Sequence, residues 1–164
     1  MNYGVIDVGS NTVRLCVYDV LCPEKRKFKT IMNRKIMAGL AAYIVDGAFS
    51  DEGIAEAILA VKKCLKRASY LSPDRVDVFA TAVLRNVSNS AQAIAAIEQG
   101  AGCSISLLSN SDEAHLGFVG ASSRGALDNG ALIDIGGGST EITVIENGVD
   151  VARTSLPQGS LSSY

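Results

Sequence analysis

The sequence predicts an α/β protein whose mixed β-sheet is flanked by helices, with elements in the order β-β-β-α-β-α-β. Three observations predict this class. Apolar runs around one acid and a glycine turn occur twice, at residues 5–15 and 132–142, and each predicts two strands joined by a turn. Residues 51–69 repeat apolar side chains at helical spacing. Breaks that contain proline or glycine separate these elements from further short apolar runs.

The N-terminal part is predicted to hold three strands, at residues 3–8, 13–20 and 27–37. The third strand mixes β-branched and basic residues, which is typical of a strand near a sheet edge. Residues 39–47 are expected to form a loop. Ser50 is the expected N-cap of the long helix over residues 51–69, because acids follow it where the helix dipole favours them.

The buried face of this helix is predicted to consist of Ile54, Ile58, Val61, Leu65 and Ala68. Basic residues load its last turns: Lys62, Lys63, Lys66 and Arg67. They are compatible with a track for polyphosphate, but a solvated helix end that matches the dipole is the preferred interpretation.

Four further elements follow in order: a break at residues 72–74, a strand over 75–84, a helix over 90–99 and a strand over 103–108. Ser111 is the expected N-cap of a helix that runs through Val119. After it come a polar loop over 122–129, the second hairpin and a strand over 149–155. Gly100 and Gly102 are expected to end the 90–99 helix.

The bulk composition excludes several classes of protein. The 164 residues are 48% hydrophobic and 20% charged with a net charge of −2, whereas nucleic-acid binders carry a basic footprint. Four cysteines without C-x-x-C spacing and a single histidine make a zinc site improbable. The sequence has no signal peptide and no run of membrane-spanning length, so we expect a cytoplasmic protein with reduced thiols and no membrane partner.

The two glycine turns carry the functional prediction. Asp134 ends a strand beside Gly136, Gly137 and Gly138, whose backbone N–H groups are unobstructed and suit a phosphate oxyanion. Alone, such a run more often marks a plain hairpin. The N-terminal copy favours a phosphate-binding turn over a plain hairpin, because Asp7 aligns with Asp134 and Gly9 with Gly136. Two such turns in one chain predict two loops that face one polyphosphate.

These two stretches, IDVGSNTVRL and LIDIGGGSTEITVIENG, closely resemble the phosphate motifs of the exopolyphosphatase / guanosine pentaphosphate phosphohydrolase family. That family belongs to the superfamily of actin, Hsp70 chaperones and sugar kinases. The resemblance implies two ribonuclease H-like (actin-like ATPase) domains with an active cleft between them. Residues 1–109 would form the first domain and residues 110–164 the opening segment of a truncated second domain, so the chain resembles an N-terminal fragment.

The predicted phosphate donors are Gly9, Ser10, Asn11, Gly136, Gly137, Gly138 and Ser139. Asp134 and Glu141 are the predicted ligands of Mg²⁺ or Mn²⁺, or organisers of water, with Asp7 as a further candidate. From the residues alone, Glu141 is equally well an exposed strand residue that pairs across its hairpin.

Glu113 is the candidate general base. By itself the Asp112-Glu113 pair is an acidic first helical turn. The family, however, carries an acidic pair followed by alanine and usually arginine, with the second acid as base. His115 replaces that arginine, and it is expected to be an ordinary exposed helix residue. Arg85 resembles the family's phosphate-contacting arginine, a role that suits its guanidinium fork.

The resemblance implies a magnesium-assisted phosphohydrolase that cleaves terminal phosphoanhydride bonds of inorganic polyphosphate, of guanosine pentaphosphate or of both. Its partner would be inorganic polyphosphate or guanosine penta- or tetraphosphate. Residues 37–40 lack an arginine and acids that relatives often carry nearby, which weakens the case for substrate contacts there. The alternatives are a sugar- or acetate-type kinase or an actin-like ATPase on the same fold, and a non-catalytic phosphate-binding module. We expect these 164 residues alone to be inactive, with an exposed strand edge that favours a homodimer.

Overall fold

The computed structural model describes residues 1–22, 24, 27–123, 125 and 127–161. The chain divides into two compact units, Met1–Leu107 and Leu108–Tyr164. In the part of the chain that the structure describes, the first unit contains a five-stranded sheet and a separate two-stranded sheet, and the second unit contains a three-stranded sheet. Among the described residues, no helix has the length and apolar character that crossing a membrane requires.

The sheet of the first unit has the strand order β3-β2-β1-β6-β7. Its strands are β1 (Asn2–Val8), β2 (Thr12–Cys22), β3 (Lys27–Met37), β6 (Arg75–Ala80) and β7 (Ser106–Leu107). The first three form an antiparallel meander, and β6 and β7 run parallel to β1. The sheet is therefore mixed, as the sequence predicts, and β3 lies at its edge.

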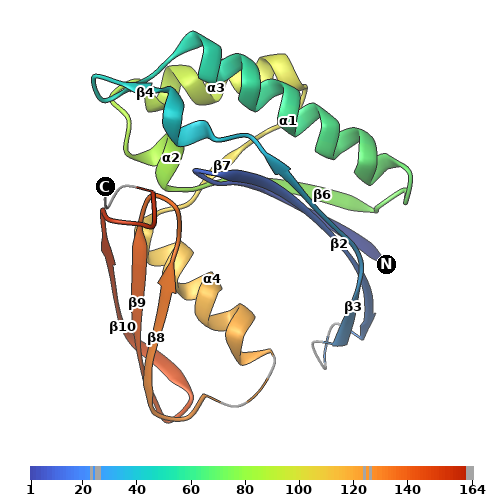
Figure 1. The fold of residues 1–164 in the computed structure, drawn as a ribbon. Coiled ribbons are helices and arrows are strands. Elements are labelled where there is room, and N and C mark those ends of the chain that lie inside the picture. Colours follow the sequence, from blue (N-terminus) through green and yellow to red (C-terminus); the bar gives the residue numbers. More distant parts are fainter. Residues whose placement is uncertain (23, 25–26, 124, 126, 162–164) are drawn as a thin grey trace. The chain divides into compact units, whose positions relative to one another are not determined.

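Two helices, α1 (Asp51–Ser69) and α3 (Ser90–Ala101), lie side by side on one face of this sheet (Figure 1). Ser50 caps α1 as predicted, because its Oγ accepts the Gly53 N–H at 3.2 Å. The residues of α1 that are fully buried are mostly smaller than expected: Gly53, Ala57, Ala60, Val61, Cys64 and Ala68. Small side chains let the helix approach the sheet closely, and the predicted Ile54, Ile58 and Leu65 are only half-buried at its flanks.

Two predictions for the first unit are wrong in detail. The strand over residues 75–84 ends at Ala80, and a short helix α2 (Ala82–Arg85) follows it. Three consecutive buried residues, 82–84, give no periodicity that separates a strand from a helix. The predicted strand over residues 103–108 shortens to the two residues of β7, which pair with the last two residues of β6.

The expected loop over residues 39–47 is more ordered than the sequence indicates. It contains a 3-10 helix, Leu40–Tyr43, and the strand β4 (Ile44–Val45), which pairs with β5 (Ala48–Phe49). The side chain of Asn89 closes this region, because its amide accepts from the Phe49 N–H and donates to the Phe49 carbonyl, both at 2.8 Å. A contact forty residues away in sequence therefore orders the hairpin.

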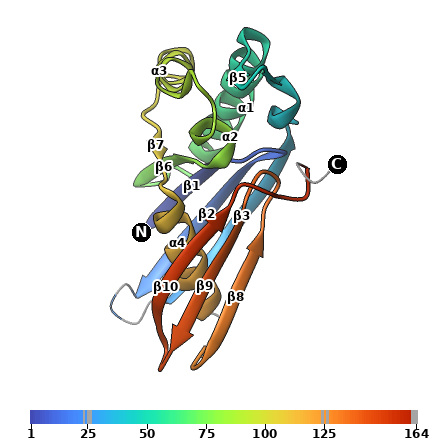
Figure 2. The same cartoon turned by 90° about the vertical axis from the view of Figure 1, so that its left-hand side faces the viewer.

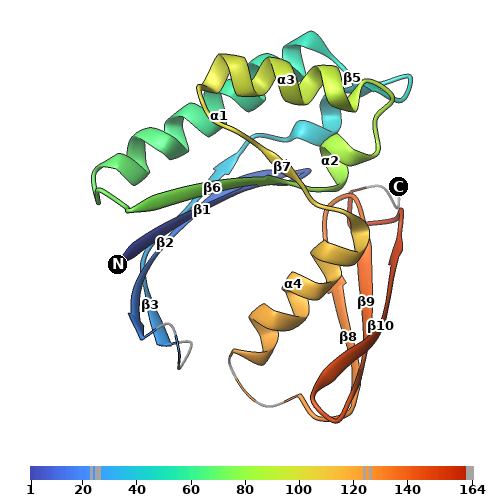
Figure 3. The ribbon, with the colours of Figure 1, turned by 180° about the vertical axis from the view of Figure 1, so that it is seen from behind.

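The second unit consists of α4 (Asn110–Ser122), β8 (Gly130–Ile135), β9 (Thr140–Glu146) and β10 (Val149–Leu156). The strands form an antiparallel sheet in the order β10-β9-β8, and α4 packs along one face of it (Figures 2 and 3). The helix is capped by Ser109 rather than by Ser111, since the Ser109 Oγ accepts the Asp112 N–H. The predicted loop over residues 122–129 includes residues 124 and 126, which lie outside the described residues.

Gly53 provides a test of the close packing between the start of α1 and the segment that precedes it, residues 40–49. A Cβ at this position would lie 2.6 Å from the Tyr43 Cβ and 2.9 Å from the Phe49 ring. We expect Gly53→Ala to lower the free energy of unfolding by about 1–3 kcal/mol through overpacking. Urea denaturation of the variant measures this loss.

The control is Gly120→Ala in α4, where nothing lies within 4 Å of the added Cβ. This change should leave stability unchanged or raise it by up to about 1 kcal/mol through helix propensity. Equal effects of the two substitutions would contradict the packing account.

Candidate phosphate-binding and catalytic site

The two glycine turns are built in the same way. The Gly9 N–H donates to the Thr12 carbonyl at 3.1 Å, and the Gly136 N–H donates to the Ser139 carbonyl at 2.9 Å. A Cβ on either glycine would lie 3.2 Å from that carbonyl oxygen. Both turns therefore favour glycine at their first position, and the alignment of Gly9 with Gly136 extends from sequence to geometry.

The carbonyl groups of the second turn are held by the segment that follows β10. The Gly136 carbonyl accepts the Ser160 N–H at 2.9 Å and the Ser160 Oγ–H at 3.1 Å. The Gly137 carbonyl accepts the Leu161 N–H at 2.9 Å. Within the described residues, the N–H groups of Gly137 and Gly138 donate to no backbone carbonyl.

Asp134 and Glu141 are directly paired across β8 and β9, which places both side chains on one face of the sheet. This face carries α4, because the Asp134 Oδ2 lies 3.7 Å from where a Cβ on Gly117 of that helix would be. Asp134 is exposed, whereas Glu141 is only 4% exposed and accepts a hydrogen bond from the Ser155 Oγ at 2.9 Å. Glu141 is therefore a buried, oriented carboxylate rather than an exposed strand residue.

Glu113 lies in the first turn of α4 and is half-buried. Gly117 follows it by one helical turn, so Glu113 and the contact point of Asp134 lie on the same side of the helix. The helix is fixed against the sheet next to Glu113, where Ala114 is buried and its carbonyl accepts the Thr143 Oγ–H at 3.4 Å. The second unit thus carries Glu113 on the side of α4 that faces Asp134, and carries Asp134 and Glu141 on the sheet face against which α4 packs.

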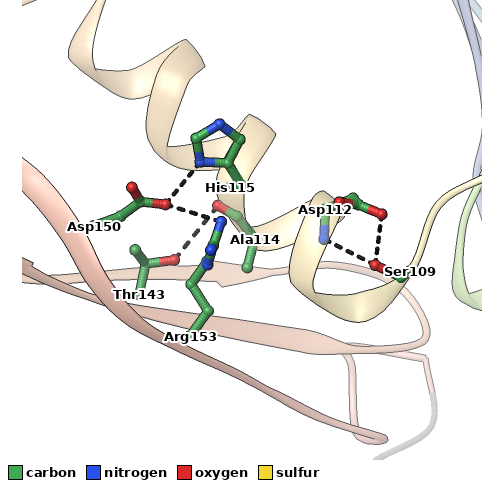
Figure 4. Close-up of polar contacts among 7 residues, drawn as sticks. All are labelled: Ser109, Asp112, Ala114, His115, Thr143, Asp150 and Arg153. Atoms are coloured by element: carbon green, nitrogen blue, oxygen red, sulfur yellow. Dashed lines mark hydrogen bonds and ion pairs between the residues drawn. The ribbon is translucent and has the colours of Figure 1, made fainter.

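The expectation for His115 is wrong: it is not an ordinary exposed helix residue. Its Nδ1 lies 2.7 Å from the Asp150 Oδ2, and the Arg153 Nη1 lies 3.2 Å from the same oxygen (Figure 4). The hydrogen bond with His115 is the main reason why the pKa of Asp150 lies below its ordinary value. This cluster ties the first half of α4 to β10, two residues beyond Glu113.

A bulge in β10 makes this cluster possible. The pairing of β10 with β9 shifts between Asp150 and Ala152, which adds one unpaired residue. Residues three apart on a regular strand point to opposite faces. The extra residue turns Asp150 and Arg153 toward the same face, where they pair with Ile145 and Thr143 respectively.

The remaining predicted site residues lie in the first unit. Asp7 pairs across the hairpin with Arg14, at the position that Glu141 occupies opposite Asp134. Val8 pairs with Ala80 of the parallel strand β6, so α2 and its last residue, Arg85, follow the same end of the sheet as the Gly9 turn. The Nε and Nη2 atoms of Arg85 are shielded from solvent.

The donor set suits a magnesium ion only in part. Among the described residues, no three His, Cys, Asp or Glu side chains come together as a metal site would require. Mg²⁺ is usually held by one or two carboxylates together with waters and substrate phosphates. The pair formed by Asp134 and Glu141 meets that smaller requirement beside the glycine turn.

Sequence reasoning missed the segment 158–161, Ser155 and the Asp150 pairing. The signal for the segment was a lone Gly159 after Pro157, which is indistinguishable from an ordinary turn. Ser155 and Asp150 gave no signal, because their partners are set by strand register and by the bulge.

Taken together, the meander-first mixed sheet and the repeated strand–aspartate–glycine turn define an α/β protein of the actin-like ATPase fold. The sequence matches the model of the Ppx/GppA phosphatase family over residues 22–162. The chain belongs to the Ppx/GppA phosphatase family, as its motifs predict.

Solved structures give the same result for the fold. An exopolyphosphatase from Cytophaga hutchinsonii matches with a TM-score of 0.87 and 25% identity, over 97% of this chain and 51% of that chain. A Ppx/GppA family member from Aquifex aeolicus matches with a TM-score of 0.82 and 23% identity, over 97% and 52%. The ethanolamine utilization protein EutJ from Carboxydothermus hydrogenoformans matches with a TM-score of 0.58 and 23% identity, over 98% and 53%. The chain spans about half the length of these proteins.

The Asp150 cluster predicts an acid-dependent contribution to stability. Because the folded pKa of Asp150 is lowered, its contribution is present above the unfolded value of about 3.9 and is lost as the pH falls through the folded value. Asp150→Asn should therefore lower the urea midpoint at neutral pH, and the difference from wild type should shrink in acid below about pH 3.9.

The control is Asp128→Asn, which changes an exposed acid of the same unit. Its urea midpoint should follow wild type at every pH. A pH-independent effect of Asp150→Asn would show that the charge of Asp150 adds nothing to its contacts with His115 and Arg153.

Proposed function

We propose that the protein containing this chain hydrolyses terminal phosphoanhydride bonds of inorganic polyphosphate or of guanosine pentaphosphate. One observation carries the proposal above all: two carboxylates, Asp134 and Glu141, sit side by side on one sheet face and flank a turn with available N–H groups. Family membership supports the same kind of chemistry.

The glycine turns bind phosphate oxygens in this proposal. The N–H groups of Gly137, Gly138 and Ser139 hold the oxygens of the group that is cleaved, as preorganised donors do where charge develops. The N–H groups of Ser10 and Asn11 in the Gly9 turn bind phosphate in the same manner. Arg85 adds a charged fork for a further phosphate oxygen.

Asp134 and Glu141 would hold Mg²⁺, or Mn²⁺ in its place, which supplies charge neutralisation to the phosphate oxygens when bound. Ser155 keeps the Glu141 carboxylate in one orientation through its 2.9 Å hydrogen bond. Asp7 is a weaker metal candidate, because Arg14 is its cross-strand partner where Asp134 has a second acid.

Glu113 acts as the general base. It accepts a proton from a water molecule whose oxygen bonds to the terminal phosphorus, while the bond from that phosphorus to the bridging oxygen breaks. The products are inorganic phosphate and a substrate shortened by one phosphate. The His115–Asp150–Arg153 cluster supports this role, since it fixes the helical turn next to Glu113.

The test is phosphate release by the full-length protein from long-chain polyphosphate and from guanosine pentaphosphate, with and without Mg²⁺. ATP with a panel of sugars, in the same assay, tests the kinase alternative. Release that needs Mg²⁺ and one of the first two substrates supports the proposal. Phosphate transfer from ATP to a sugar, or no release from any substrate, would contradict it.

For the general base, we expect Glu113→Gln to lower kcat by about 10²–10⁴-fold with little change in substrate affinity. The matched control is Asp112→Asn in the same helical turn, an exposed acid that accepts from Ser109 Oγ at 2.6 Å. That variant should keep near-normal kcat. If the two variants lose activity equally, the acidic turn serves the helix and not the reaction.

For the metal site, Asp134→Asn should remove most of the Mg²⁺-dependent turnover while the unfolding midpoint stays near that of wild type, because Asp134 is exposed. Glu146→Gln is the control, since it neutralises an exposed acid on β9, at the end away from the turn. Near-normal Mg²⁺-dependent turnover by Asp134→Asn would remove Asp134 from the proposed metal site.

A further inference from the structure

The backbone of segment 158–161 encloses one side of the glycine turn between β8 and β9. Besides the N–H groups of Ser160 and Leu161, which bind the carbonyls of Gly136 and Gly137, the Thr140 Oγ donates to the Gln158 carbonyl at 2.6 Å. We refer to residues 158–161 as the carbonyl clasp. It attaches to both the first half of the turn and the first residue of β9.

Gly159 is the point of closest approach within the clasp. A Cβ at this position would lie 2.5 Å from the Gly137 carbonyl carbon, and 2.6 Å from both the Gly137 oxygen and the Gly138 nitrogen. These three atoms belong to a single peptide group, which cannot bend away as the end of a flexible side chain could. The clasp therefore lies directly against the Gly137–Gly138 peptide, and only a residue without a Cβ fits there.

The clasp determines the direction of two N–H groups. A trans peptide is planar, so its N–H points away from its carbonyl. The clasp binds the carbonyl of the Gly136–Gly137 peptide and that of the Gly137–Gly138 peptide. The N–H groups of Gly137 and Gly138 consequently point away from the clasp. They are the donors that the proposed function assigns to phosphate.

The first unit repeats this arrangement independently. There the segment after β3 binds the turn between β1 and β2: the Ser10 carbonyl accepts the Ala41 N–H at 2.8 Å, and the Asn11 carbonyl accepts the N–H groups of Ala38 and Gly39 at 3.1 and 3.0 Å. Ser10 aligns with Gly137 when Gly9 is placed on Gly136. The same carbonyl is therefore held, by the segment after the third strand, in both units.

From these contacts we infer that the carbonyl clasp, through Gly159, is the positioning element of the phosphate-binding turn. It orients the N–H groups of Gly137 and Gly138 before any ligand arrives and does not itself touch the substrate. Preorganised donors stabilise the developing charge only while their direction is fixed. A displacement of a positioned group by about 1 Å can lower the rate on the order of 10²-fold. This inference rests on the proposed function, because it explains how the N–H groups that the function assigns to phosphate are held in position.

The experiment compares Gly159→Ala with wild type in the full-length protein, in binding of tripolyphosphate by calorimetry and in phosphate release. We expect Gly159→Ala to bind tripolyphosphate at least about tenfold more weakly than wild type, and its kcat/KM to be at least about tenfold lower. A misplaced group costs up to about 10²-fold in rate, so losses of this size are expected when the turn donors lose their direction. Gly120→Ala, which adds a Cβ in open space in the same unit, should match wild type in both measurements.

A second pair of variants keeps the inference testable if Gly159→Ala does not fold. Thr140→Val removes the hydroxyl that holds the Gln158 carbonyl, and Thr140→Ser retains it. The valine variant should lose affinity for tripolyphosphate and the serine variant should restore it, with equal unfolding midpoints. If the Thr140 hydroxyl only stabilised the fold, Thr140→Val would lower the unfolding midpoint, and the two variants would not differ in their affinity for tripolyphosphate.

If Gly159→Ala and Thr140→Val bind tripolyphosphate as tightly as wild type does, the positioning role of the carbonyl clasp is overturned and the proposed function stays intact. Wild-type protein that binds tripolyphosphate without releasing phosphate would refute the proposed hydrolysis, and the binding measurements would still decide the clasp. If wild type neither binds nor hydrolyses, both fail.

Discussion

The structure depends on one backbone constraint that occurs twice, a hydrogen bond closed across a glycine turn. In each unit the N–H of the first glycine of the turn donates to the carbonyl three residues later. The Gly9 N–H donates to the Thr12 carbonyl at 3.1 Å, and the Gly136 N–H donates to the Ser139 carbonyl at 2.9 Å. This tight closure sets the register of the flanking strands, so that Asp7 meets Arg14 and Asp134 meets Glu141. The chemistry proposed for the second unit follows from that register, because pairing places both of its acids on the face that α4 covers.

The same closure fixes where the second unit differs from the first. Arg14 of β2 and Glu141 of β9 occupy equivalent positions just beyond the two turns, so the turns share a backbone design while their flanking strands differ in charge. Under the proposed function, the first turn binds phosphate and the second binds phosphate together with a cation. Around the second turn, Ser155 orients Glu141 and the His115–Asp150–Arg153 cluster secures α4, so the candidate base and the candidate metal ligands rest on packed elements.

Much of this arrangement was predictable from the sequence, because it is local. The order of the main strands and helices, the bounds of α1 and the two turns follow from apolar periodicity, a cap and repeated glycines. The features that the sequence does not predict depend on distant backbone. The bulge in β10 turns Arg153 toward the face of Asp150, Asn89 orders the hairpin near Phe49, and Gly159 fits against the peptide between Gly137 and Gly138. None of these leaves a periodic or compositional signal, and a buried run such as residues 82–84 is compatible with strand or helix alike.

The central claim is that the backbone N–H groups of the glycine turns bind phosphate. Amide NMR of the full-length protein during titration with tripolyphosphate tests it most directly. The account predicts saturable shifts of the Gly137 and Gly138 amides, together with that of Asn11, which strengthen when Mg²⁺ is added. Shifts confined to the exposed basic end of α1, around Lys62 and Lys66, with the turn amides unmoved, would contradict it.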